Sequence, residues 1–168
     1  MLLKTYTFTG KHAVFMAHLM GEDLENPDIK RPKFFERNID VMFAAALVGF
    51  RQHKLGEAET SADAKRTILN EQILKSSSLI QFIYRTIVLL DDNIENTSEE
   101  KLKIAFAEST TSHDASKITT DEQSEKYEKL FYNYILGGIE YLYDNLINSG
   151  QSDPIENIHQ LIQDFDVK

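Results

Sequence analysis

The chain has 168 residues, 42% of them hydrophobic, which suits one domain that buries its own core without a metal or disulfide. It has no cysteine, which excludes thiol catalysis and cysteine-based metal sites and suits a reducing cytosol. The net charge is -9, and residues 76–168 hold 17 Asp/Glu against 7 Lys/Arg, so this acidic half should repel nucleic acid and could offer a surface to a protein partner.

The N-terminal third begins with a weak alternation of apolar residues. Residues 2–8 place Tyr6 and Phe8 on one face, which predicts a short strand whose partner is unknown. A helix capped by Thr9 then runs to Leu19. A loop over residues 22–33 follows, because prolines punctuate it.

Two strongly apolar segments are predicted to form the most buried helices. Phe34–Lys54 reads as a long helix whose middle, Val41–Phe50, is apolar on every side. Leu79–Leu90 reads as a second core helix, and Thr60 or Ser61 would cap a helix before it that ends near Leu74. Val41–Phe50 is the longest apolar run and about half the length that a bilayer needs. With no signal peptide visible either, we expect a cytoplasmic protein with no membrane contact.

The C-terminal half predicts at least three further helices. Thr97 and Glu100 fit a capping box, and Asp153-Pro154 fits the start of the last helix. Between them, Glu122–Asn148 forms one long helix or two, interrupted by Gly137-Gly138. Ser109–Asp121 is polar and is expected to be a flexible loop.

These elements predict an all-α fold. We expect a compact bundle of about six or seven helices with a short N-terminal strand, formed by residues 1–168 as a single domain. At least two-thirds of the ordered residues should be helical, against about one-third in an average protein.

Three patterns resemble metal sites, and each lacks ligands. His113-Asp114 is the doublet of the all-helical HD phosphohydrolases, but it lies in the most loop-like stretch. Glu156 and His159 form one Glu-x-x-His motif where a di-iron bundle needs two. His18 and Glu22 lie four residues apart, and two ligands do not make a site. We therefore predict no metal, cofactor or catalytic residue, and a metal-dependent HD-type hydrolase is the less favoured alternative.

A local excess of positive charge lies between residues 28 and 54. It supports an alternative hypothesis, a nucleic-acid-binding module. The excess is only three charges, so any DNA binding should be weak and salt-sensitive. The candidate binding residues are Lys30, Arg31, Lys33, Arg37, Arg51 and Lys54.

Arg85 and the glycine pair call for structural explanations. Arg85 lies inside an apolar segment and needs a partner, for which Asp40 is a candidate. Gly137 and Gly138 either hold an anion at a helix start or let two helices approach closely. Close packing against Val41–Phe50, at an axial distance of about 8 Å, is the commoner arrangement. Alanine should then be a milder replacement than leucine.

Two stretches together resemble a known family. One is Phe35-x5-Val41-x-Phe43-Ala44-Ala45-Ala46-Leu47-Val48-Gly49-Phe50-Arg51, and the other is Phe131-x-x-Tyr134-x-x-Gly137-Gly138-Ile139-Glu140-x-Leu142. They are similar to the small proteins encoded beside bacterial DNA phosphorothioation (dnd) systems and called dnd system-associated. The resemblance covers two helices and not the middle of the chain.

The resemblance implies a role beside bacterial DNA modification and defence, and it supplies no catalytic residues. Our leading hypothesis is a non-enzymatic accessory protein that binds a protein of such a complex. This hypothesis is also compatible with a homo-oligomer. The motif residues that we expect to be structural are Gly49, Phe50, Arg85, Tyr134, Gly137, Gly138 and Glu140.

Overall fold

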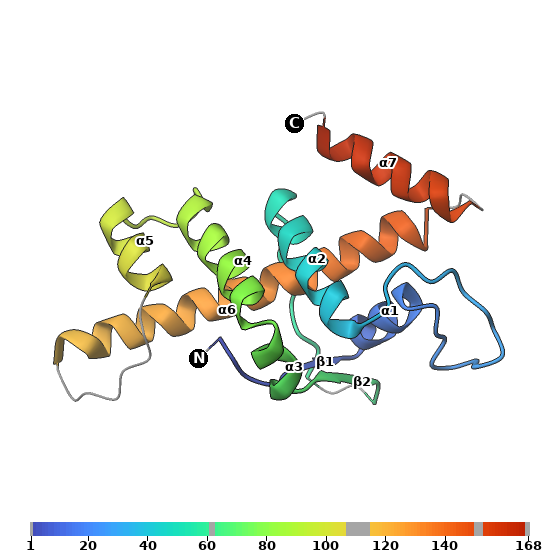
Figure 1. Ribbon diagram of the computed structural model, residues 1–168, viewed down its shortest axis with the longest axis horizontal. Coiled ribbons are helices and arrows are strands. Elements are labelled where there is room, and N and C mark those ends of the chain that lie inside the picture. The colour runs from blue at the N-terminus through green and yellow to red at the C-terminus, as the bar shows by residue number, and fades with distance from the viewer. Residues whose placement is uncertain (1, 61–62, 107–114, 150–152, 167–168) are drawn as a thin grey trace.

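A computed structural model describes residues 2–60, 63–106, 115–149 and 153–166 (Figure 1). Over these residues the chain forms seven helices and one two-stranded antiparallel sheet. The elements in order are β1 (Tyr6–Thr9), α1 (Lys11–Leu19), α2 (Asn38–Arg51), β2 (Lys65–Ile68), α3 (Asn70–Lys75), α4 (Ser77–Leu90), α5 (Ser98–Ala105), α6 (Ala115–Leu146) and α7 (Pro154–Asp166). The mainly helical class and the short N-terminal strand are confirmed. The helical share of 61% is lower than predicted, because irregular segments follow both α1 and α2.

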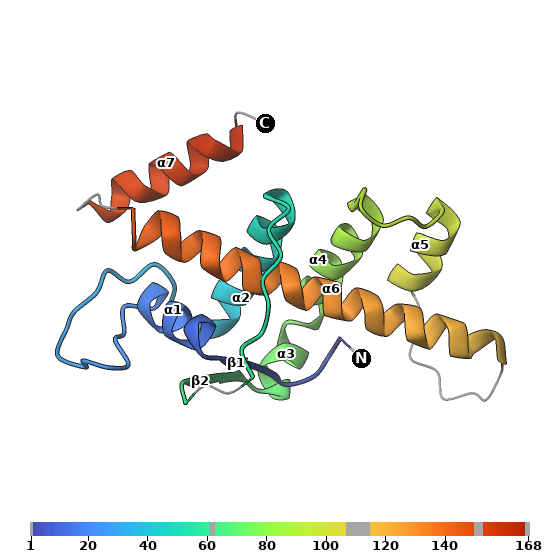
Figure 2. The same ribbon diagram turned by 180° about the vertical axis from the view of Figure 1, so that it is seen from behind.

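Helix α6 is the spine of the fold. Its 32 residues span about 48 Å at 1.5 Å per residue. In Figures 1 and 2, α4 and α5 lie toward one end of α6, α2 crosses its middle, and α7 lies at the other end. The helix runs through Gly137 and Gly138 without a break.

The start of α6 corrects the predicted loop over residues 109–121. Residues 115–121 are helical, and residues 107–114 lie outside the described part of the chain. The stretch has no glycine or proline to stop a helix, and a polar sequence extends a helix readily when its C-terminal part is anchored.

The strand β1 pairs with β2, so that Tyr6 lies opposite Ile68 and Thr9 opposite Lys65. The sequence placed residues 65–68 in a helix, which is wrong. A four-residue strand leaves little periodicity, and its partner lies some 60 residues away. The pairing buries Tyr6 and Phe8, and the Phe8 ring stacks on Tyr132 of α6 at 5.8 Å.

The two apolar helices differ in burial. Helix α2 is largely enclosed, as predicted, with Val41, Met42 and Ala45 inaccessible. Helix α4 buries only its inner face. Its outer face leaves Phe82 65% exposed and Leu90 62% exposed. The prediction that α4 is one of the two most buried helices is therefore wrong, because the described chain covers only one side of this apolar helix.

Two predicted helix starts are confirmed. The backbone N–H of Glu100 donates to Thr97 Oγ1 at 3.3 Å, and the backbone N–H of Thr97 donates to Glu100 Oε2 at 2.8 Å, which completes a capping box. At α7, the backbone N–H of Ile155 donates to Asp153 Oδ1 at 2.9 Å, and Pro154 is the first helical residue.

Candidate functional site

Glycines bring α2 and α6 into backbone contact. A Cβ added to Gly138 would lie 1.8 Å from the Ala45 carbonyl oxygen, and one added to Gly49 would lie 2.0 Å from the Tyr134 carbonyl oxygen. No side chain fits at either position. The close-packing interpretation therefore agrees with the structure at Gly138.

Gly137 differs in its neighbour. A Cβ there would lie 2.0 Å from the carbonyl oxygen of Lys54, in the segment that follows α2 rather than in α2 itself. Both glycines lie inside α6, where backbone N–H groups are engaged within the helix. The alternative of an anion held at a helix start is therefore wrong.

A buried polar link ties this crossing to the end of α4. The Tyr134 hydroxyl donates to Asp91 Oδ2 at 2.6 Å, and both side chains are almost inaccessible. Burial, and then the neighbouring Asp91, raise the pKa of Tyr134 well above its usual value. The Phe50 ring packs edge-on against Tyr134 at 5.7 Å. The sequence did not indicate Asp91 as a functional residue, because it reads only as the polar end of an apolar helix.

Glu140 is the centre of an ion-pair cluster. Its Oε1 lies 3.0 Å from His12 Nε2 and 3.1 Å from Lys11 Nζ, and its Oε2 lies 3.8 Å from Lys54 Nζ. Burial would raise the pKa of Glu140, but hydrogen bonds and charges from Lys11 and His12 outweigh it and lower that pKa. The cluster joins α1, α6 and the segment after α2, so the role of Glu140 here is to hold elements together.

His12 predicts a loss of stability in mild acid. Burial lowers the pKa of His12 below 6.5, although Glu140 and Glu59 oppose this and Lys11 adds to it. The unfolded chain therefore binds the proton more readily than the folded one. The stability that neutral His12 gives is complete above about pH 6.5 and is lost as pH falls below it.

We expect the free energy of unfolding to decrease between pH 7.5 and pH 5.5 and His12→Gln to weaken that dependence. Urea titrations at the two pH values measure it. The exposed His159 supplies the control, since His159→Gln should keep the wild-type dependence. This account would be contradicted if the free energy of unfolding changed with pH by the same amount in His12→Gln and in the wild type. His18 adds to the same window, because burial and Arg31 lower its pKa as well.

Most of the six basic residues are engaged within the chain itself. Carboxylates lie close to four of them: Arg31 is 2.6 Å from Asp23, Lys33 is 2.5 Å from Glu36, Arg37 is 2.7 Å from Asp40, and Lys54 is 3.5 Å from Asp144. Arg51, at the far end of α2 from Arg37, donates to the carbonyl oxygen of Phe165 at 3.4 Å, and Lys30 is exposed in the loop before α2. The positive excess is thus spread over the loop before α2, the end of α2 and the segment after it, and carboxylates offset most of its charge.

Arg85 is held by α5 and not by Asp40, which corrects the predicted partner. Its Nε donates to the Ala105 carbonyl oxygen at 3.2 Å, and its guanidinium lies 4.5 Å from the centre of the Phe106 ring. Asp40 instead accepts two hydrogen bonds from Arg37. The sequence could not identify this partner, because a carbonyl group and a ring face leave no charge pattern.

The candidate metal ligands remain dispersed. His18 lies 3.7 Å from Asp23, whereas Glu22 pairs with Arg66. Glu156 and His159 are exposed on α7, and His113 and Asp114 lie outside the described residues. Within the described ranges there is no group of three or more side chains suited to hold a metal ion.

Helices α4 and α5 carry an uncovered apolar surface, which we call the α4–α5 face. Its large side chains are each about half exposed or more: Leu79, Phe82, Leu90, Leu102 and Phe106. Leu79, Phe82 and Leu90 are spaced so that they form one stripe with Thr86 along α4. Arg85 stacked on Phe106 joins this stripe to α5. Sequence alone did not reveal the face, because an apolar run looks the same whether or not it is covered.

Helix α7 carries a second uncovered surface, which we call the α7 face. Ile155 is 75% exposed, and Ile158 and Ile162 are about half exposed. The opposite side attaches α7 to α6, because Leu161 is buried and Asn157 Nδ2 donates to the Leu146 carbonyl oxygen at 3.1 Å. Sequence alone did not indicate that these three isoleucines stay uncovered.

No protein-family model, curated protein or solved structure matches the chain. Among the described residues, no helix has the length and apolar character needed to cross a membrane.

Proposed function

We propose that the chain is a non-enzymatic adaptor that binds protein partners within a bacterial DNA-modification or defence system. One observation carries the adaptor role. Two uncovered apolar surfaces, the α4–α5 face and the α7 face, lie toward opposite ends of α6 (Figure 1). Contiguous apolar surface of this kind is rare on isolated proteins and is typical of interaction sites.

The composition of the α4–α5 face supports binding. The Arg85 guanidinium lies over the Phe106 ring, and the exposed Phe82 lies three residues before Arg85 on α4. Aromatic residues and arginine are the types most enriched where binding energy concentrates. The face lies on two helices that pack against each other and against the rest of the fold, so it is formed before a partner arrives. Less ordering on binding means a smaller entropic cost.

The link to DNA modification rests on the resemblance. The two stretches that carry it are α2 and the second half of α6, which pack together through Gly49 and Gly138. Their shared motif residues serve packing and ion pairing, which supports a common core architecture. The partner would accordingly be a protein of the modification or restriction complex.

Substitutions on the α7 face test this function. We expect Ile155→Asp with Ile162→Asp to reduce affinity for the partner at least tenfold, because each large apolar anchor contributes about 1.5–3 kcal/mol when buried. The chain would be co-expressed with the proteins encoded beside its gene, and the affinity of the purified pair measured by calorimetry. Ile29→Asp, about half exposed in the loop before α2, is the matched control.

Two results would overturn the proposal. One is that none of the co-encoded proteins binds the wild-type chain. The other is that the purified wild-type chain turns over a nucleotide or nucleic acid substrate, since an adaptor has no such activity.

A further inference from the structure

We infer that the α4–α5 face binds a second copy of this chain, with the two α4 helices antiparallel across a two-fold axis. The inference rests on the proposed function in one respect, that this face is an interaction surface. It leaves the α7 face of each copy for the protein partner.

The stripe on α4 fits a copy of itself. Its positions 79, 82, 86 and 90 are spaced by three, four and four residues. In an antiparallel pair, Leu79 of one copy would lie near Leu90 of the other, and Phe82 would lie near Thr86. The same residues thus meet from both sides, as a two-fold contact requires. Spacing by threes and fours also suits helices that cross at a shallow angle.

The charges around the stripe favour a copy over a charged partner. Between residues 78 and 90 the sole charged residue is Arg85, and α5 already holds it through Ala105 and Phe106. On α5, Glu99 lies 2.8 Å from Lys103 and offsets its positive charge. A basic peptide or an anionic lipid surface would find few complementary charges here.

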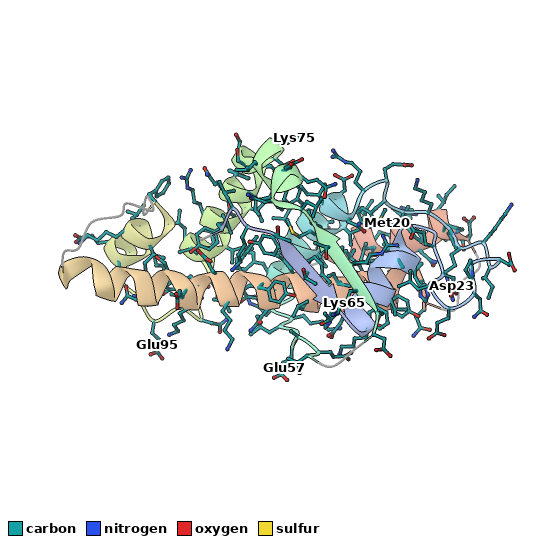
Figure 3. All side chains as sticks on the ribbon, turned by 90° about the horizontal axis from the view of Figure 1, so that it is seen from below. Met20, Asp23, Glu57, Lys65, Lys75 and Glu95 are labelled. Carbon is teal, nitrogen blue, oxygen red and sulfur yellow. The ribbon has the colours of Figure 1, made fainter. Side chains whose placement is uncertain are left out.

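The ends of α4 carry opposite charges. Lys75, the last residue of α3, lies two residues before the start of α4, Asp92 lies two residues after its end, and both are exposed. Figure 3 shows Lys75 at the surface on the side of α3 and α4 that faces away from α6. An antiparallel copy would bring each Lys75 toward the other copy's Asp92, whereas a parallel copy would set like charges together.

The apolar area is of the size that a modest dimer buries. Five large side chains at about half exposure offer roughly 500 Å² of apolar surface per copy. The exposed Ser78 and the partly exposed Thr86 and Leu89 extend the contact toward the roughly 800 Å² per partner of a standard interface. Each dimer would carry two α7 faces, so a partner complex with two matching sites would bind with added avidity.

Oligomeric state tests the contact. Sedimentation equilibrium of the wild-type chain should show a reversible dimer at micromolar concentration. Phe82→Asp with Leu90→Asp should raise the dimer dissociation constant at least a hundredfold. Ile29→Asp should leave it unchanged. Both altered side chains of the double variant are more than half exposed, so its helix content by circular dichroism should match the wild type.

Cross-linking tests the orientation, since the chain has no cysteine of its own. In the antiparallel register, residue 86 lies about 5 Å along the axis from its counterpart, and residue 78 lies almost 20 Å from its own, at 1.5 Å per residue. Thr86→Cys should therefore couple to itself through a short bismaleimide, and Ser78→Cys should not. Coupling at residue 78 without coupling at residue 86 would overturn the arrangement.

The two proposals fail in different ways. A wild-type chain that stays monomeric at 100 µM, and still binds a co-encoded protein through α7, overturns the dimer and leaves the adaptor. A dimer with the expected cross-link that binds no co-encoded protein overturns the adaptor role and leaves the dimer.

Discussion

Replacing Gly138 with alanine is expected to lower the free energy of unfolding by about 3 kcal/mol, at the upper end of ordinary overpacking. The added Cβ would lie 1.8 Å from the carbonyl oxygen of Ala45 and 2.5 Å from its carbonyl carbon. Both are backbone atoms of a buried helix, so α2 and α6 would have to separate. Alanine gains at most about 1 kcal/mol over glycine in helix propensity, too little to offset this. Alanine adds less bulk than leucine and should remain the milder replacement of the two, but at Gly138 it is not a small change.

Urea denaturation of Gly138→Ala measures the effect. Lys129→Ala, on an exposed part of the same helix, should stay within about 0.5 kcal/mol of the wild type. Gly137→Ala should fall between them, because its neighbour is the irregular segment at Lys54, which can shift more easily than a helix. A Gly138→Ala variant as stable as the wild type would mean that the two helices do not pack backbone to backbone.

The sequence predicted those features of the fold that depend on nearby residues. The Thr97 capping box, the start of α7 at Pro154 and the burial of α2 each follow from a pattern within a few residues. The strand β2 was missed because it is stabilised by pairing with β1, which is distant in the sequence, and local periodicity does not indicate such a pairing. Residues 115–121 were missed because polar residues suit loops and exposed helices alike.

The candidate surfaces were harder to predict for a different reason. The pattern of α4 shows that the helix is apolar and gives no information on how much of it the chain covers. Charge patterns had the same weakness. The basic residues form a local positive excess in the sequence, but in the structure Arg31 pairs with Asp23 and Lys54 pairs with Asp144. Glu140 stood out in a motif, but its contact with His12 joins residues 128 positions apart.

Removing the carboxyl group of Asp91 is expected to lower the free energy of unfolding by about 2–3 kcal/mol. It accepts hydrogen bonds from the Tyr134 hydroxyl at 2.6 Å, the Asn93 backbone N–H at 2.9 Å and the Asn93 side chain at 3.1 Å. In Asp91→Ala the Tyr134 hydroxyl would stay buried without this acceptor, and a buried donor left unsatisfied costs about 1–3 kcal/mol. Because Asp91 ends α4 and Tyr134 lies at the α2–α6 crossing, the loss should loosen the contact between those elements.

A double-mutant cycle separates this hydrogen bond from the general effect of altering the core. Tyr134→Phe removes the hydroxyl that Asp91→Ala leaves without an acceptor. Adding Tyr134→Phe to Asp91→Ala should therefore lower the free energy of unfolding by less than Tyr134→Phe does in the wild type. The two changes should therefore fall short of additivity by at least about 0.5 kcal/mol, as contacting partners do. Glu95→Ala is the control in the same loop, since Glu95 is exposed on the opposite side of the molecule from Lys75 (Figure 3). It should change stability little and add simply to Tyr134→Phe. If Asp91→Ala and Tyr134→Phe also add simply, the buried link does not hold α4 to the α2–α6 crossing, and packing alone positions the α4–α5 face.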